Sequence, residues 1–192
     1  PRRNLLIALI NSGNIDMARP LAEDIWQRAK STPSLPARQR AQYARHLGFI
    51  YLQTGDSEDG LGLMHKAIEI DPTYGEPYLV LGVIAGMRGD NEQALDWFNS
   101  GIENSPRNAN AYFNRGVALQ SLGRIQEAEK AFRECISIGT RNADTHMALA
   151  NLLWRQGRIT ETVPLYREAT RLYPDSAEAR FWLGRALTPT QQ

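Results

Sequence analysis

One glycine recurs at a constant interval through most of this chain. Four such glycines are spaced 34 residues apart, with no insertion or deletion between them: Gly55, Gly89, Gly123 and Gly157. Repetition at this interval is typical of stacked helical hairpins, because a hairpin of this size cannot bury its own apolar face and depends on its neighbours for a core. The spacing therefore predicts an all-helical array that offers an extended surface.

Alignment on these glycines divides the chain into units of helix A, turn, helix B and linker. We expect a degenerate first repeat with a proline-containing linker (1–40), four full repeats (41–74, 75–108, 109–142 and 143–176), and a terminal capping helix with a tail (177–192). Proline closes helix B in three of the full repeats, since it cannot continue a helix. Thr140 takes its place in the third.

Within each predicted helix A, buried residues recur at i, i+3, i+4 and i+7, the period of one helical face. The middle of this stripe is always a small residue: Gly48, Gly82, Gly116, Ala150 and Gly184. Glycine inside a helix costs about 1 kcal/mol relative to alanine. We therefore expect a close approach of helix B at these positions.

The second unit shows the landmarks most completely, and its sequence is GEPYLVLGVIAGMRGDNEQALDWFNSGIENSPRN. Its aromatic, Leu-Gly, Gly-Asp, Ala, Phe and Pro positions resemble the tetratricopeptide repeat family, and the resemblance covers residues 41–187 without a gap. Departures include Arg115 for leucine and His146 for the aromatic residue. The resemblance implies a right-handed superhelical solenoid of antiparallel helix pairs, which binds proteins or peptides on a concave wall of A helices.

The positions that follow the buried stripe by one residue, a turn of about 100° around the axis of helix A, are the ones expected to line this concave wall. The candidate partner-binding residues are Arg45, Phe49, Leu52, Leu79, Val83, Met87, Phe113, Asn114, Val117, Met147, Asn151, Trp154, Phe181 and Arg185. Most are apolar, which predicts an apolar or amphipathic peptide or helix as ligand. The alternative is that these side chains pack against neighbouring repeats and are only half exposed.

In the chaperone-cofactor repeats that this chain resembles, polar groups on successive A helices grip the terminal carboxylate of a peptide. Four apolar residues stand here where that grip would need polar side chains: Phe49, Leu79, Val80 and Val83. We therefore expect a different ligand from the acidic C-terminal tail of a heat-shock chaperone.

Charge and motifs argue against several other functions. Residues 41–108 carry 4 Lys and Arg against 10 Asp and Glu, which opposes binding of nucleic acid. We find no phosphate-binding loop, metal-ligand motif or nucleophile elbow. The three histidines and the single Cys135 fit structural or surface positions. The expectation is a non-enzymatic chain with no catalytic residues, metal or other cofactor.

A second interpretation is a structural or oligomerisation array within a larger multidomain enzyme or a bacterial secretion or assembly machine. Self-association would then involve the apolar C-terminal helix around Trp182. The apolar runs are too short to insert directly into a membrane, so we expect a soluble protein, cytoplasmic or periplasmic. The start at Pro1 suggests a fragment of a longer chain, and 19 Arg against 3 Lys favours a GC-rich bacterial source.

Overall fold

The computed structural model describes residues 2–139 and 141–188, and in these ranges the only regular secondary structure is α-helix. Its helices are α1 (Arg2–Asn11), α2 (Ile15–Lys30), α3 (Ala37–Thr54), α4 (Ser57–Ile70), α5 (Gly75–Met87), α6 (Asn91–Asn104), α7 (Ala109–Ser121), α8 (Ile125–Ser137), α9 (Ala143–Arg155), α10 (Ile159–Leu172) and α11 (Ala177–Leu187). Consecutive helices form antiparallel hairpins. The predicted all-α solenoid of helix pairs is confirmed.

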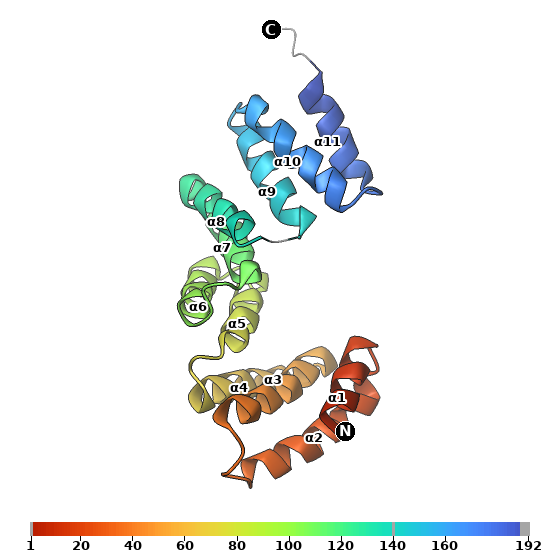
Figure 1. The fold of residues 1–192 in the computed structure, drawn as a ribbon. Coiled ribbons are helices and arrows are strands. Elements are labelled where there is room, and N and C mark those ends of the chain that lie inside the picture. The colour runs from red at the N-terminus through yellow and green to blue at the C-terminus, as the bar shows by residue number, and fades with distance from the viewer. Residues whose placement is uncertain (1, 140, 189–192) are drawn as a thin grey trace.

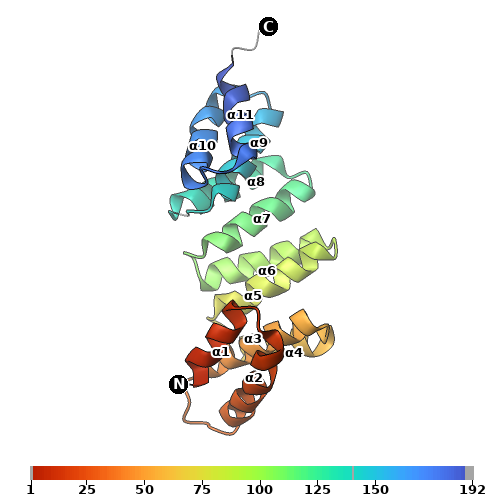
Figure 2. The same cartoon turned by 90° about the vertical axis from the view of Figure 1, so that its right-hand side faces the viewer.

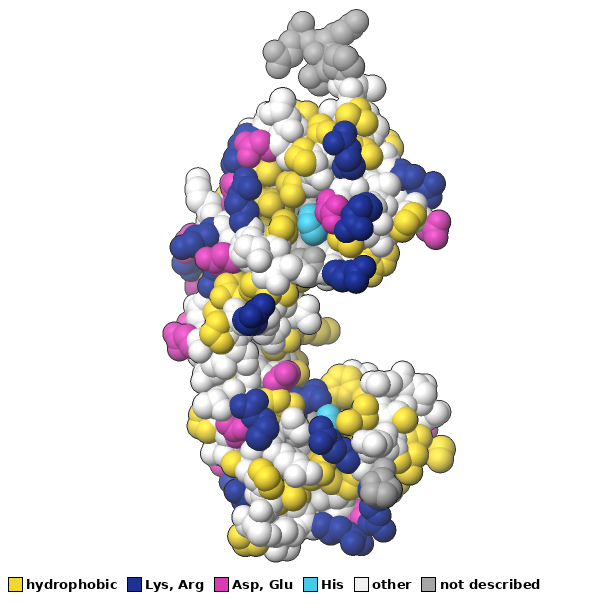
Figure 3. Space-filling model, viewed as in Figure 1, with side chains coloured by type: hydrophobic (Ala, Val, Ile, Leu, Met, Phe, Trp, Pro, Cys, Tyr) yellow, Lys and Arg dark blue, Asp and Glu magenta, His cyan; other side chains and the backbone are white. Residues whose placement is uncertain are grey.

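The hairpins stack in chain order to form an open crescent. Helices α1 to α4 form one end, α9 to α11 form the other, and α5 to α8 are set back between them (Figure 1). The space-filling view shows the resulting hollow on the right-hand side (Figure 3). Figure 2 turns this side to the viewer and shows the pairs following one another along the long axis. The crescent therefore offers one concave side.

The glycines that mark the repeat end each helix A in the left-handed region of backbone space. Their φ angles lie between 72° and 91° for Gly55, Gly89, Gly123 and Gly157. Residues with a side chain rarely adopt this conformation, so glycine is the residue these turns require. In one repeat Asp90 then accepts a hydrogen bond from the backbone N–H of Gln93 at 3.1 Å and begins α6.

The small residues inside the A helices allow an aromatic ring of helix B to approach closely. A Cβ placed on Gly116 would lie 2.5 Å from Cε1 of Phe132, and one on Gly82 would clash in the same way with Phe98. A Cβ on Gly184 would have no neighbour within 4 Å, since no helix follows α11 in the described part of the chain. Close packing thus offsets the helix-propensity loss at Gly82 and Gly116.

The apolar core is divided along the solenoid. The first cluster extends from Leu6 to Tyr74 and joins α1 to α4, whereas the second extends from Ala85 to Leu153, with Leu79 packed against it. A smaller third cluster joins α9, α10 and α11. The first two clusters share no residue, and α4 touches α5 less extensively than α2 touches α3. A break in the core therefore lies at the junction of α4 and α5.

The division into units that the sequence suggested stays a prediction. Helix α3 starts at Ala37, four residues ahead of the expected unit 41–74, and α11 spans the predicted capping helix. Three of the sequence-based expectations concern Pro1, Thr140 and the tail 189–192, which lie outside the described residues.

Candidate functional site

An apolar cavity of about 540 Å³ opens between α3 and α5, beside the break in the core. We call it the α3–α5 pocket. Its lining residues are Phe49, Leu52, Gln53, Ser57, Leu79, Val80, Val83, Ile84, Met87 and Arg88. Seven of these ten side chains are apolar, so the pocket offers mostly carbon surface to an occupant.

The helical period explains how these side chains come together. Phe49 and Leu52 lie three residues apart on α3, while Leu79, Val83 and Met87 recur every four residues along α5. Residues at these spacings share one helical face. Val83 is 37% exposed and Met87 is 84% exposed. Apolar side chains thus remain uncovered where α3 and α5 face each other.

Charged side chains stand at two places around this pocket. Arg88 forms part of its lining, and Arg45 lies one helical turn before Phe49 on α3. Arg45 is half-buried, and its Nε atom is buried without a hydrogen-bond partner. Burial raises the pKa of the nearby Tyr74 hydroxyl, and the positive charge of Arg45 partly opposes that rise. Arg45 therefore lies near Tyr74, the residue that precedes α5, and one helical turn from the lining residue Phe49.

Next to Arg45 on the same helix, His46 is buried and its Nδ1 has no hydrogen-bond partner. Burial lowers the pKa of His46 to about 4, and the charges of Arg45 and Arg3 act in the same direction. The imidazole is therefore neutral at pH 7. The positive charge in this region comes from the arginines.

The predicted residues of α7 lie apart from the α3–α5 pocket. Phe113 packs its ring against Phe132, with centroids 6.0 Å apart. Asn114 donates a hydrogen bond from its side-chain amide to the carbonyl of Asn110, at 2.8 Å. Val117 is 42% exposed and lines a separate cavity of about 440 Å³ beside α9. Phe113 and Asn114 therefore make contacts within the protein.

At the C-terminal end, the predicted residues gather around one tryptophan. Trp154 meets Trp182 with centroids 5.4 Å apart, and Arg185 lies over both rings. Phe181 also contacts Trp182 and is 57% exposed. These contacts form an aromatic cluster between α9 and α11.

The two remaining candidates on α9 have partners within the protein. The side-chain oxygen of Asn151 accepts a hydrogen bond from the Tyr166 hydroxyl at 2.8 Å, and Met147 packs against the third core cluster. The structure thus brings five of the predicted residues into one pocket, namely Phe49, Leu52, Leu79, Val83 and Met87. It does not bring the others into that pocket.

Five lining residues were not among the candidate binding residues: Gln53, Ser57, Val80, Ile84 and Arg88. Residues 79–87 of α5 are apolar or glycine throughout, so periodicity does not show which face is covered. Arg88 is the residue just before the turn glycine, and nothing in the repeat pattern marks that position as part of a binding site. The position of α5 relative to α3 was the missing information.

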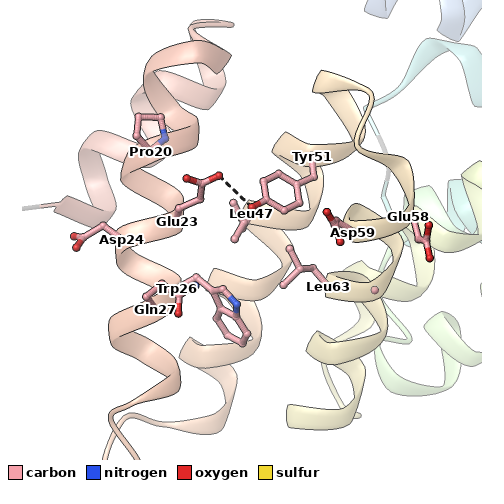
Figure 4. A pocket seen from close by; sticks show the side chains of 11 residues that line it. Pro20, Glu23, Asp24, Trp26, Gln27, Leu47, Tyr51, Glu58, Asp59 and Leu63 are labelled. Carbon is pink, nitrogen blue, oxygen red and sulfur yellow. Dashed lines mark hydrogen bonds between the residues drawn. The ribbon is translucent and has the colours of Figure 1, made fainter.

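A second, larger cavity of about 970 Å³ lies between α2 and the α3–α4 hairpin and was not anticipated either. Figure 4 shows Trp26, Leu63 and Tyr51 around it, with the tyrosine hydroxyl directed at Glu23. Glu23 accepts that hydrogen bond at 3.1 Å and also pairs with Arg19 at 3.2 Å. The hydrogen bond joins α2 to α3, and the carboxylate of Glu23 is already paired with an arginine of its own helix.

Other kinds of site find little support in the described residues. No group of three or more His, Cys, Asp or Glu side chains lies close enough in these ranges to hold a metal ion. No described helix is long and apolar enough to cross a membrane. The Cys135 thiol is 1% exposed, and its Sγ lies 3.1 Å from the carbonyl oxygen of Ala109.

The stacked hairpins and the apolar surface pocket indicate a scaffold for protein interaction. Three segments match family models: residues 87–123 match a model described as TPR repeat, and residues 109–138 and 147–188 match models described as tetratricopeptide repeat. Residues 87–138 and 147–188 thus contain tetratricopeptide repeats.

Solved structures of MamA have a similar fold. One MamA crystal structure matches with a TM-score of 0.68 at 22% sequence identity, covering 89% of this chain and 95% of its own. MamA AMB-1 matches with 0.65 at 25% identity, covering 91% and 99%, and MamA MSR-1 with 0.62 at 26%, covering 92% and 97%. No curated protein sequence matches the chain.

Proposed function

We propose that this protein is a scaffold that binds an amphipathic helix or an apolar peptide segment of a partner protein in the α3–α5 pocket. The observation that carries the proposal is the uncovered apolar surface between α3 and α5. A pocket of about 540 Å³ falls within the range of about 300–1,000 Å³ typical of ligand sites. It accommodates a few apolar side chains of a partner.

The energetics fit a binding site of moderate affinity. Complete burial of one apolar side chain contributes about 1.5–3 kcal/mol, from which the ordering of the ligand must be subtracted. Phe49, Leu52 and Leu79 are already half-buried, so they require little additional ordering. Met87 is the most exposed, and its unbranched thioether adapts to different partner shapes.

The repeat provides a matched pair of variants for a test. Val83 and Val117 occupy equivalent positions of neighbouring A helices and are 37% and 42% exposed, but only Val83 lines the α3–α5 pocket. A displayed library of random peptides is selected on the wild-type protein, on Val83→Glu and on Val117→Glu. We expect apolar peptides to be enriched by the wild type and by Val117→Glu, and to be lost with Val83→Glu.

Circular dichroism of both variants controls for folding. Equal enrichment by all three proteins would place binding outside this pocket. No enrichment of apolar peptides by the wild type would contradict the proposed function itself.

The second candidate function is self-association through α11. It is favoured by the exposed Phe181 and Leu187, at 57% and 55%, and by the open space beside Gly184. Sedimentation velocity at rising concentration tests it. A protein that stays monomeric over that range, with Phe181→Ser indistinguishable from the wild type, would contradict this candidate.

A further inference from the structure

We propose that the partner segment bound in the α3–α5 pocket carries acidic side chains beside its apolar anchors, and that Arg45 and Arg88 receive them. This inference rests on the proposed function, because it names the chemistry of the ligand for the same pocket. The occupant would be a segment of another protein with side-chain carboxylates flanking two or three apolar residues.

The distribution of charge between the two kinds of helix is the first argument. Residues 41–108 are acidic overall, but their Asp and Glu residues lie almost entirely on α4, on α6 and in the turns. Glu76 is the one acidic residue of α3 and α5 in this range. The walls of the α3–α5 pocket are therefore free of the negative charge that the composition of this region suggests.

The second argument is the pairing of arginines in the N-terminal half. Arg19 and Arg38 each form an ion pair, with Asp56 at 2.6 Å and with Asp71 at 2.5 Å. Arg45 has no carboxylate within ion-pair distance in the described part of the chain, although it is half-buried. Its positive charge acts on the nearby Tyr74 hydroxyl, and its buried Nε has no hydrogen-bond partner.

A half-buried guanidinium without a carboxylate is costly, because desolvation of the charge is not offset by a partner. Glu76 acts on the same Tyr74 hydroxyl as Arg45, but it forms no ion pair with Arg45 in the described part of the chain, and two other titratable neighbours supply no negative charge. His46 is neutral at pH 7, since burial lowers its pKa to about 4, and Arg3 adds a further positive charge. A carboxylate of a bound partner would supply the missing counter-charge to Arg45.

Arg88 supplies the matching positive charge within the pocket lining. It is exposed, and it has no ion-pair partner among residues 2–139 and 141–188. Apolar side chains therefore lie between two arginines, one on α3 and one at the end of α5. This arrangement distinguishes the pocket from the cavity beside α2, where Glu23 and Asp24 are already paired with arginines.

Helix geometry sets the spacing of the expected ligand. Arg45 precedes Phe49 by four residues and Leu52 by seven, which is about 6 Å and about 10 Å along the axis of α3. A bound helix would thus place a carboxylate one to two turns from its apolar anchors. Guanidinium and carboxylate groups form paired hydrogen bonds, so this contact would fix the direction in which the segment lies.

The test uses the displayed peptide library as its probe and compares the wild type with Arg45→Glu, Arg88→Glu and the control Arg107→Glu. Arg107 is exposed and lies in the turn before α7, away from the pocket lining. We expect the wild type and Arg107→Glu to enrich peptides with Asp or Glu near their apolar residues. Arg45→Glu and Arg88→Glu should shift that preference towards Lys and Arg.

A synthetic peptide from the wild-type pool then provides the quantitative measurement. Replacing its Glu by Gln should weaken binding to the wild type about tenfold, and this loss should disappear in either Arg45→Gln or Arg88→Gln, according to which arginine pairs with that Glu. Arg88 is exposed, so we expect Arg88→Glu to fold. That variant still tests the inference if Arg45→Glu does not fold. Apolar peptides without any charge preference would overturn this inference and leave the proposed function standing. The absence of apolar peptides from the pool would overturn both.

Discussion

The glycines inside the A helices allow one prediction to be worked out in detail, because chemically identical substitutions should have opposite effects. In Gly116→Ala, the new Cβ lies 2.5 Å from Cε1 and 2.7 Å from Cδ1 of Phe132. In Gly86→Ala, the nearest atom is the Cβ of Ala94 at 3.9 Å, an ordinary contact. Both glycines lie within helices, α7 and α5.

The magnitude follows from two terms. Replacing a helical glycine by alanine stabilises the helix by about 1 kcal/mol, and this gain applies to both variants. Overpacking of a filled core costs about 1–3 kcal/mol, and it applies to Gly116 alone. Phe132 is fully buried, so its ring has no free space into which to move. We expect Gly116→Ala to be destabilised by about 1 kcal/mol and Gly86→Ala to be stabilised by up to about 1 kcal/mol.

Urea denaturation followed by far-ultraviolet circular dichroism measures both variants against the wild type. A third variant, Gly184→Ala, occupies the position equivalent to Gly116 in α11, where no atom lies within 4 Å of the new Cβ. It should behave like Gly86→Ala, with a smaller effect near the end of a helix. An increase in stability for Gly116→Ala would refute the explanation that close helix packing requires glycine there.

Two further predictions concern buried polar groups. Because the pKa of His46 is about 4 in the folded protein, against about 6.5 when unfolded, the unfolded chain takes up the proton first as the pH falls. The folded protein should lose about 2 kcal/mol of stability between pH 7 and pH 5, and His46→Gln should lose clearly less over the same range of pH, as measured by urea denaturation. An equal loss in both proteins would contradict the assignment to His46. Tyr166→Phe removes the hydrogen bond to Asn151 and should lower the free energy of unfolding by about 1 kcal/mol. Asn151→Ala should add little to Tyr166→Phe in a double-mutant cycle, and additive effects would contradict the pairing.

The architecture could be predicted from the sequence because local signals repeat in register. The 34-residue interval located the turns, and the glycine that each turn needs has a positive φ as expected. The small residue inside helix A was also informative, since a loss of helix propensity implies a compensating contact. At Gly116 that contact is the Phe132 ring.

The site could be predicted only in part, because it depends on how neighbouring helices are positioned. Polar and apolar residues mostly occupy different faces of α3, so the sequence shows which face carries Phe49 and Leu52. The central part of α5 is apolar on every side, so the sequence does not distinguish Val80 from Val83 as a lining residue. The sequence likewise does not show that Arg45 has no carboxylate partner among the described residues, because that depends on its three-dimensional neighbours.

The break between the first two core clusters has a mechanical consequence. The two walls of the α3–α5 pocket belong to parts of the solenoid with separate cores, one on each side of the α4–α5 junction. A segment wedged between them would act as a strut that sets the angle between the two ends of the crescent. Occupancy of the pocket and curvature of the molecule would then change together, so that a partner held at one end of the crescent could alter the width of the concave side for another.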